Sequence, residues 1–143
     1  MDVAGILGSA VGMDKDVMKR LLRDARIPTA KFLVLARGKP VPEFAAVTAS
    51  LGVPVFVKPA NLGSSVGIAK AGTAEEYDRA VAAAFQYDTK VLLEESVIGR
   101  EIECSVLGNQ DPIASVPGEI VTGGGHEFYD YDAKYLDENG ASC

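Results

Sequence analysis

Several short apolar segments in the second half of the chain are separated only by turns, and this arrangement limits the fold more than any other feature. After residue 88, VLLEE (91–95), EIECSVL (101–107) and one or two segments within 112–121 follow one another with no helix between them. Strands joined by turns pair antiparallel. We therefore expect an α+β fold with a mainly antiparallel sheet and helices packed on one face, in preference to a doubly wound parallel sheet.

The first half of the chain is expected to supply the helices. Apolar residues recur at helical spacing over 13–26, and an alanine-rich helix is predicted over 43–51. Thr73 and Glu76 form a capping-box pair at the start of a third helix. The residues expected on the buried faces are Met13, Val17, Met18, Leu21, Leu22 and Ala25 in the first helix, and Tyr77, Ala80, Val81, Ala84 and Phe85 in the third.

Three strands are expected among these helices. KFLVLA (31–36) and VPVFVK (53–58) are short apolar runs, and GIAKA (67–71) is predicted to return as the second strand of a hairpin. The glycine-containing segment from residue 122 onward predicts a long loop, which in a compact domain is usually functional or disordered.

Composition excludes several classes of protein. The 143 residues carry a formal net charge of −6, which argues against a nucleic-acid-binding surface. No apolar run is long enough to span a bilayer and no signal peptide is evident, so we expect a cytoplasmic protein without a membrane partner. Cys104 and Cys143 have no metal-binding spacing, and a buried thiol and a free one are expected.

Both ends of the sequence resemble interior segments, which suggests a piece of a larger protein.

The loop GSSVG (63–67) has two interpretations. Glycine permits close backbone approach to a ligand, and serine adds hydroxyl donors for an anion. The same residues are common in ordinary turns, and no Walker A motif is present, so the loop alone favours a turn. Lys58, at the end of the preceding strand, favours a phosphate-binding loop over an ordinary turn. Lys58 and Lys15 could each also be solvated surface lysines.

Acidic and aromatic residues supply further candidates. Glu101 and Glu103 share one face of a strand, where they could bind ribose hydroxyls or a metal, or form the wet side of a sheet. His126, the single histidine, is expected at the surface. The aromatic cluster either covers a ligand or packs on the sheet, and it comprises Phe128, Tyr129, Tyr131 and Tyr135, with Lys134 among them.

Five segments together resemble the D-alanine–D-alanine ligases of the ATP-grasp superfamily: GMDK, VKPANLGSSVGI, VLLEE, GREIECSVLG and FYDYDAKYL. The resemblance implies an ATP-grasp central subdomain and a ligase of peptidoglycan synthesis. In that reaction ATP phosphorylates one D-alanine, and the amine of a second D-alanine attacks the acyl phosphate. Mg²⁺ neutralises the phosphates, and the resemblance is compatible with a homodimeric parent.

The resemblance also implies roles for individual residues. Lys15 and Lys58 match lysines that contact ATP phosphates, as expected for compact cations. Ser64 and Ser65 match the loop serines that touch phosphate and position substrate. The remaining nucleotide contacts are Glu94 on the adenine side, the backbone of Glu95 and Val97 at the adenine edge, Glu101 on the ribose, and Phe128 against the purine.

The closing loop of the family supplies the last predicted residues. Lys134 matches a phosphate-binding lysine, and Tyr135 matches a tyrosine that hydrogen-bonds Ser64, so these three form the expected catalytic set. Tyr135 also favours D-alanine as the second substrate. Closure of such a loop would protect the acyl phosphate from water.

The resemblance implies a division of the chain into a linker (1–12), a central ATP-binding subdomain (13–121) and a mobile closing loop at the start of the C-terminal lobe (122–143). The metal ligands are expected in the rest of that lobe, so the chain alone is expected to be inactive. A non-catalytic nucleotide-binding module is an alternative. Another ATP-grasp carboxylate–amine ligase is a second alternative, which FYDYDAKY argues against.

Overall fold

The computed structural model describes residues 5–122 and 141–142. The chain divides into two compact units, one formed by Val11–Val97 and the other by Met1–Ala10 together with Ile98–Cys143. Helix α1 (Ile6–Met13) crosses the boundary between them. The second boundary, at Val97, falls inside the segment 13–121, whose assignment as a single subdomain stays a prediction.

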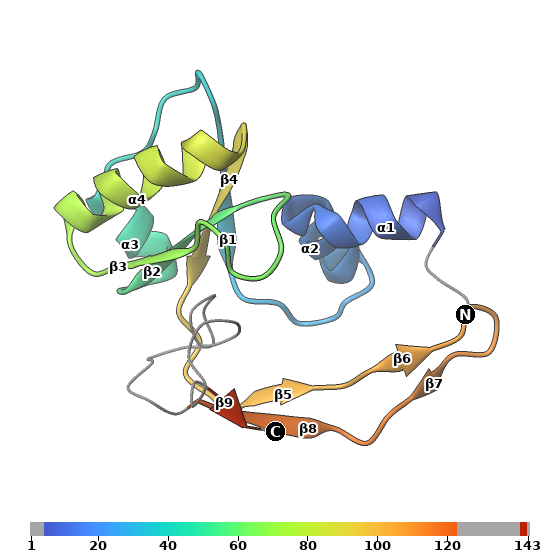
Figure 1. Ribbon diagram of the computed structural model, residues 1–143. Helices are drawn as coiled ribbons and strands as arrows, with labels where there is room; N and C mark the ends of the chain where they lie inside the picture. The colour runs from blue at the N-terminus through green and yellow to red at the C-terminus, as the bar shows by residue number, and fades with distance from the viewer. Residues whose placement is uncertain (1–4, 123–140, 143) are drawn as a thin grey trace. The chain divides into compact units, whose positions relative to one another are not determined.

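The Val11–Val97 unit is built on an antiparallel sheet with strand order β1-β4-β2-β3 (Figure 1). The predicted α+β class with an antiparallel sheet is confirmed. The strands are β1 (Phe32–Ala36), β2 (Val55–Pro59), β3 (Ala69–Ala71) and β4 (Lys90–Glu95), and the helices of this unit are α2 (Lys15–Asp24), α3 (Phe44–Leu51) and α4 (Ala74–Tyr87).

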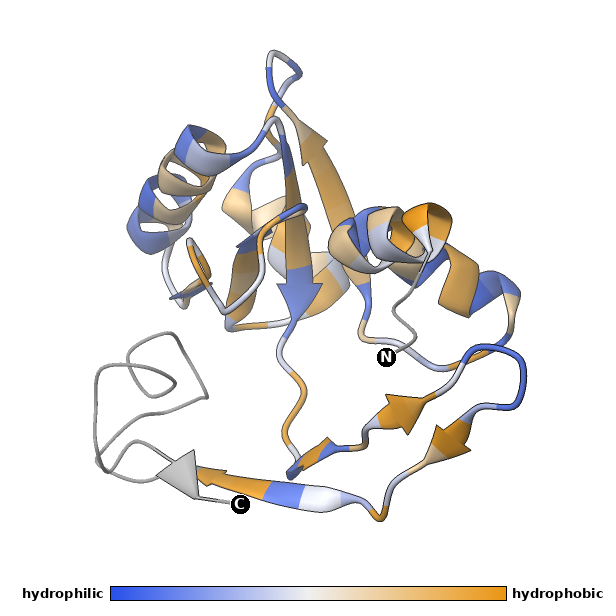
Figure 2. Cartoon of the chain, turned by 45° about the vertical axis from the view of Figure 1, so that its right-hand side comes forward, coloured by the Kyte–Doolittle hydropathy of each residue, from blue (hydrophilic) through white to orange (hydrophobic). Residues whose placement is uncertain are grey.

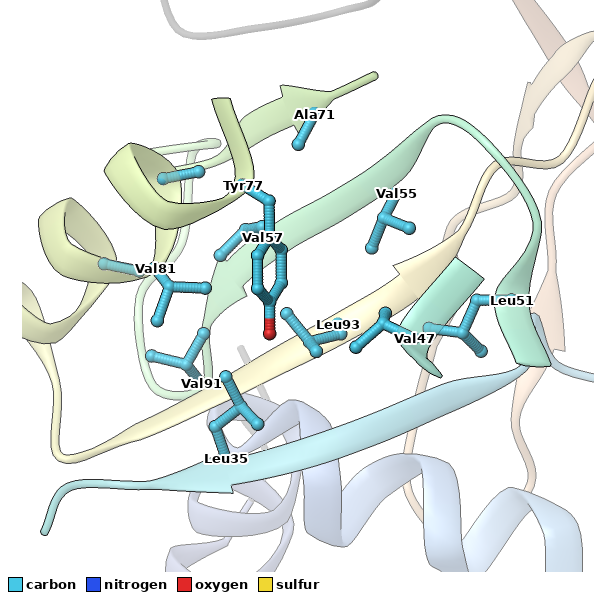
Figure 3. Close-up of a cluster of buried hydrophobic side chains, with 12 residues drawn as sticks. Leu35, Val47, Leu51, Val55, Val57, Ala71, Tyr77, Val81, Val91 and Leu93 are labelled. Atoms are coloured by element: carbon cyan, nitrogen blue, oxygen red, sulfur yellow. The ribbon is translucent and has the colours of Figure 1, made fainter. Parts of the chain in front are cut away.

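The hydrophobic core lies between one face of this sheet and helices α3 and α4 (Figure 3). Val47 and Leu51 of α3 and Tyr77 of α4 point into it, and the Tyr77 hydroxyl donates a hydrogen bond to the Pro42 carbonyl at 3.0 Å. Many residues of the strands are hydrophobic, whereas α4 contains both hydrophobic and hydrophilic residues (Figure 2). The strands contribute Leu35, Val55, Val57, Ala71, Val91 and Leu93 to this core.

Helix α4 follows the sequence prediction closely. The Thr73 hydroxyl accepts a hydrogen bond from the Glu76 N–H, and the Glu76 carboxylate accepts one from the Thr73 N–H, which completes the capping box. The predicted face is buried at Tyr77, Ala80, Val81 and Ala84, and Phe85 packs against the core while partly buried. The spacing of apolar residues therefore identified the inner side of this helix.

Helix α2 differs from its prediction. The expected continuous helix over 13–26 is interrupted at Asp14, whose side chain accepts hydrogen bonds from two backbone N–H groups and so caps a helix that begins at Lys15. Met13, Val17 and Leu21 are exposed, contrary to the predicted buried face. The buried side chains of α2 are instead those of Asp16 and Lys19.

The second unit contains short antiparallel strands. Sheet β5-β8-β9 comprises β5 (Glu101–Glu103), β8 (Gly118–Thr122) and β9 (Ala141–Ser142), and β6 (Val106–Leu107) pairs with β7 (Ile113–Ala114). The predicted strand over 101–107 is therefore two strands. Cys104 lies between them and is exposed, so the expected buried thiol is wrong, whereas Cys143 lies outside the described residues.

No helix in the described part of the chain is long and apolar enough to cross a membrane.

Candidate nucleotide-binding site

The face of the sheet opposite the hydrophobic core carries charged residues. Side chains alternate along a strand, so Val91 and Leu93 of β4 enter the core while Lys90 and Glu94 point to the other side. On the neighbouring strand β2, Lys58 lies on this same charged side. The sheet thus separates an apolar core from a polar face, on which α2 lies.

Glu94 is the centre of this polar face. Its Oε1 is 2.7 Å from Lys58 Nζ and its Oε2 is 2.8 Å from Lys19 Nζ, so each carboxylate oxygen has its own lysine. The strand register places Phe32 and Phe56 directly beside Glu94, one on each neighbouring strand. The Lys19 and Lys58 ammonium groups lie 5.3 Å and 5.4 Å from the centres of these two rings.

The two lysines keep Glu94 ionised despite its burial. Burial by itself raises the pKa of Glu94, because a charged carboxylate is poorly solvated there. The attraction of Lys58, the hydrogen bonds from Lys19 and Lys58 and the attraction of Lys19 outweigh this effect, and the pKa of Glu94 is lowered. A negative charge is therefore held between two positive charges at neutral pH.

Lys15 connects α2 to the start of the GSSVG loop. Its ammonium donates hydrogen bonds to the carbonyls of Pro59, at 3.2 Å, and Leu62, and its backbone N–H donates to the Ala60 carbonyl at 3.0 Å. Burial lowers the pKa of Lys15, and repulsion from Lys58 lowers it further. Lys15 therefore contacts the backbone that directly follows Lys58, the other lysine predicted to bind phosphate.

The loop itself has a left-handed backbone at several residues. Ser64 and Ser65 have φ angles of 51° and 59°, and Gly67 has a φ angle of 71°. Non-glycine residues rarely adopt this conformation, and such strained residues cluster at ligand-binding sites. At the base of the loop, Asp88 Oδ2 accepts hydrogen bonds from the Asn61 N–H at 2.8 Å and from its amide Nδ2 at 2.9 Å.

The structure therefore brings together only part of the predicted site. Lys15, Lys58, Glu94 and the loop carrying Ser64 and Ser65 all belong to the Val11–Val97 unit. Contacts join Lys58 to Glu94, and join Lys15 to the carbonyls of Pro59 and Leu62, which lie between Lys58 and the loop.

The structure gives no contact between the other predicted residues and Lys15, Lys58 or Glu94 within the part of the chain that it describes. Glu95 accepts a hydrogen bond from the Lys31 N–H at 2.7 Å, and Val97 is exposed at the end of the same unit. Glu101 lies exposed on β5 in the other unit. Phe128, Tyr129, Tyr131, Lys134 and Tyr135, together with His126, lie outside the described residues.

Sequence reasoning missed two charged residues of α2 that contact the sheet. Lys19 reaches Glu94, and Asp16 Oδ2 is 3.2 Å from Lys90 Nζ, which also lies 2.5 Å from Asp14 Oδ2. The spacing of Lys15 and Lys19 places both on one side of the helix, which is the one signal that could have indicated their common orientation. Apolar periodicity alone assigned that side to solvent.

Within residues 5–122 and 141–142, no group of three or more histidine, cysteine or acidic side chains is arranged to hold a metal ion. The Mg²⁺ ligands were predicted to lie in a further part of the parent protein, and that assignment stays a prediction.

Comparison with known proteins identifies the family. Residues 21–143 match the family model described as "D-ala D-ala ligase C-terminus". D-alanine–D-alanine ligase A of Chromobacterium violaceum is 57% identical over 139 residues, and that of Salmonella typhimurium is 55% identical over 137. These alignments cover 96% and 95% of this chain, but the chain spans only about 37% of the length of either relative.

Solved structures agree with the sequence comparison. The D-alanine–D-alanine ligase of Coxiella burnetii aligns with a TM-score of 0.72 and 39% identity, covering 77% of this chain and 33% of that one. The VanG D-Ala:D-Ser ligase of Enterococcus faecalis aligns with a TM-score of 0.75 and 34% identity, covering 93% of this chain and 37% of that one. The chain therefore belongs to the D-alanine–D-alanine ligase family and corresponds to part of the family's C-terminal region.

Proposed function

We propose that this chain supplies the ATP-binding part of a ligase that joins two D-alanines. The observation that carries the proposal is the position of Lys15, whose ammonium donates hydrogen bonds to the carbonyls of Pro59 and Leu62, between Lys58 and the GSSVG loop. Two cations beside a serine-containing loop favour a polyanion such as a triphosphate. Membership of the ligase family makes ATP the expected polyanion.

Lys15 and Lys58 are proposed to bind the ATP phosphates. Lys15 donates hydrogen bonds to backbone carbonyls, and Lys58 is paired with Glu94. When phosphate binds, each lysine would either give up these contacts or keep them while it also contacts the phosphate. Ser64 and Ser65 are proposed to contact phosphate and to position the substrate. The strained backbone at both serines supports a ligand-binding role for the loop.

The remaining nucleotide contacts follow the family assignment. Glu94 is proposed to lie on the adenine side, with the backbone of Glu95 and Val97 at the adenine edge and Glu101 on the ribose hydroxyls. Phe128 is proposed to pack on the purine. Glu94 is held in the required ionised state by its two lysines, which supports its use as a hydrogen-bond acceptor.

The proposed reaction has two steps. A carboxylate oxygen of the first D-alanine attacks the γ-phosphorus of ATP, which releases ADP and forms an acyl phosphate. The amine of the second D-alanine then attacks the acyl carbon, which forms the peptide bond and releases phosphate and a proton. We propose that Lys134 stabilises the transferring phosphate and that Tyr135 orients Ser64 as the closing loop, 122–143, excludes water.

Mg²⁺ would neutralise the phosphates when bound, and we propose that segments of the parent protein beyond those shared with this chain provide its ligands. We further propose that the parent acts in the cytoplasm in peptidoglycan synthesis, with a homodimer as a possible assembly, and that the chain alone does not ligate.

A nucleotide-binding module without catalytic activity is the second candidate function. Another ATP-grasp carboxylate–amine ligase is the third, and one structural relative is a D-Ala:D-Ser ligase. We propose D-alanine over D-lactate as the second substrate because of Tyr135, since the family resemblance associates phenylalanine at this position with relatives that use D-lactate.

The proposal is tested by calorimetric titration of the 143-residue chain with ATP and Mg²⁺. We expect a micromolar Kd, and we expect Lys58→Met to raise it about tenfold or more, because a charge-assisted contact contributes roughly 1.5–3 kcal/mol. Lys39→Met is the matched control, because Lys39 is an exposed lysine in a turn between β1 and α3. We expect this control to bind ATP as the wild type does.

A ligation assay separates the candidate functions. We expect the chain with ATP, Mg²⁺ and D-alanine to form no D-alanyl-D-alanine, and the full-length parent to form it and release ADP. Absence of ATP binding by the wild-type chain would contradict the proposed function. A full-length parent that binds ATP but produces no dipeptide would favour the non-catalytic module.

A further inference from the structure

Lys19 is buried, which is unusual for a lysine. Its side chain is 8% exposed, and its ammonium lies 2.8 Å from Glu94 Oε2 and 5.3 Å from the centre of the Phe32 ring. Lysine is rarely this buried unless its charge is paired. The contact on Glu94 explains how Lys19 is tolerated, but not why a second lysine is needed on a carboxylate that Lys58 already pairs with.

The charge balance of the cluster suggests a reason. Lys58 and Glu94 alone would be a neutral pair, with both carboxylate oxygens available to Lys58. With Lys19 present, the three side chains carry a net charge of about +1, and Lys58 retains only Oε1. Lys15 lies at the carbonyls of Pro59 and Leu62, where Lys58 repels it and Asp88, Glu94 and Asp14 attract it.

A second ion-pair cluster on α2 provides a contrast. Lys90 contacts Asp14 and Asp16, and Arg20 Nε lies 2.5 Å from Asp16 Oδ1. Two cations and two carboxylates balance there, as expected for a purely structural connection between α2 and β4. The cluster around Glu94 has an excess of positive charge, as expected for a site that receives an anion.

We propose that Lys19 is a positioning residue of the nucleotide site, which occupies Glu94 Oε2, restricts Lys58 to Oε1 and thereby leaves part of the Lys58 charge available to a polyphosphate. Lys19 itself need not touch the nucleotide. The inference rests on the proposed function, because it assigns Lys58 to the phosphates. It extends that function by adding a residue to which the family resemblance gave no role.

The test compares Lys19→Met with the wild type and with the exposed control Lys39→Met. In calorimetry with ATP and with inorganic tripolyphosphate, we expect Lys19→Met to raise both Kd values about tenfold, because Glu94 can then neutralise Lys58 completely. Lys19→Arg retains the charge, and we expect it to restore most of the affinity. Lys39→Met should bind both ligands like the wild type.

The recovery of tripolyphosphate affinity in Lys19→Arg is the readout that a merely structural role for Lys19 would not give, and a carbon-13 NMR titration of the Glu94 carboxyl tests whether Lys19 acts through Glu94. We expect the pKa of Glu94 to rise in Lys19→Met, since a neighbouring positive charge is lost. If Lys19→Met does not fold, Lys19→Gln, which keeps a hydrogen-bond donor without the charge, is measured with the same expectations.

The outcomes distinguish the inference from the proposed function. If the wild type binds neither ATP nor tripolyphosphate, the proposed function fails and the inference fails with it. If the wild type binds and the folded Lys19 variant binds equally tightly, or shows an unchanged Glu94 pKa, the inference alone is overturned.

Discussion

Gly67 shows how closely single residues are constrained in the GSSVG loop. Its φ angle of 71° lies in the left-handed region, and a Cβ added there would lie 2.9 Å from side-chain atoms of both Pro59 and Tyr87. Both the backbone conformation and the close contact therefore require glycine. Gly63, at the other end of the same loop, has open space around the position of a Cβ.

We expect Gly67→Ala to lower the free energy of unfolding by about 2–3 kcal/mol, because alanine is strained in this conformation and overlaps its neighbours. Urea denaturation measures the change. Gly63→Ala in the same loop is the control, and we expect it to change stability by less than about 0.5 kcal/mol. Equal stabilities for the two variants would contradict this account of Gly67.

The residues of the candidate site were predicted from the sequence only in part. Lys15 and Lys58 were identified through the family resemblance, and the Lys15 ammonium does lie at the carbonyls of Pro59 and Leu62, just after Lys58 in the chain. The burial of Asp16 and Lys19 was not predicted, because periodicity counts apolar residues and places charged ones in solvent. The charges that pair with them, Lys90 and Glu94 on β4, come from a distant part of the sequence, so a local pattern could not reveal the pairing.

At the scale of whole elements, local signals were sufficient where one helix packs on the core. The start and the inner face of α4 followed from its capping box and from apolar spacing. The same reasoning failed for α2, which lies on a charged face of the sheet. It also failed for the segment 101–107, where alternation predicted one strand but the structure has β5 and β6, with Ile102 and Val106 exposed.

The capping box gives a prediction at this scale. Thr73→Ala removes the hydroxyl that accepts the Glu76 N–H, and we expect it to lower the free energy of unfolding by about 1 kcal/mol. Thermal or urea unfolding measures the loss. Thr48→Ala is the matched control, since its hydroxyl only donates to the Ala45 carbonyl within α3, and alanine favours a helix.

We expect Thr48→Ala to leave stability unchanged or slightly increased. If Thr73→Ala were as stable as the wild type, the cap would contribute nothing to the start of α4, contrary to the geometry described above.

At the scale of the whole molecule, the chain consists of two units, and the described candidate site lies mostly in one of them. The Val11–Val97 unit contains the loop, Lys15, Lys58 and Glu94, with its own core on the other side of the sheet. The α+β class was predictable, because strands joined by turns leave few alternatives to antiparallel pairing. The division at Val97 was not predictable, since no change in composition marks it.

A different anion site would compete with this account. At the C-terminal end of α2, a groove of about 460 Å³ is lined by Arg23, Arg26 and Lys31, along with the apolar residues Ile27, Pro28 and Phe32. Its basic side chains could attract ATP without any part in a ligase reaction. A direct test of the central claim must therefore locate the nucleotide as well as detect its binding.

Nuclear magnetic resonance of the nitrogen-15-labelled chain, titrated with ATP and Mg²⁺, locates the bound nucleotide. The account predicts saturable shifts of the backbone amides of Lys58, Glu94 and the loop 62–67, with smaller changes around the groove at Arg26. Shifts confined to the groove, or saturable binding that leaves Lys58 and the loop unchanged, would contradict the claim that this sheet face and its loop are the ATP site.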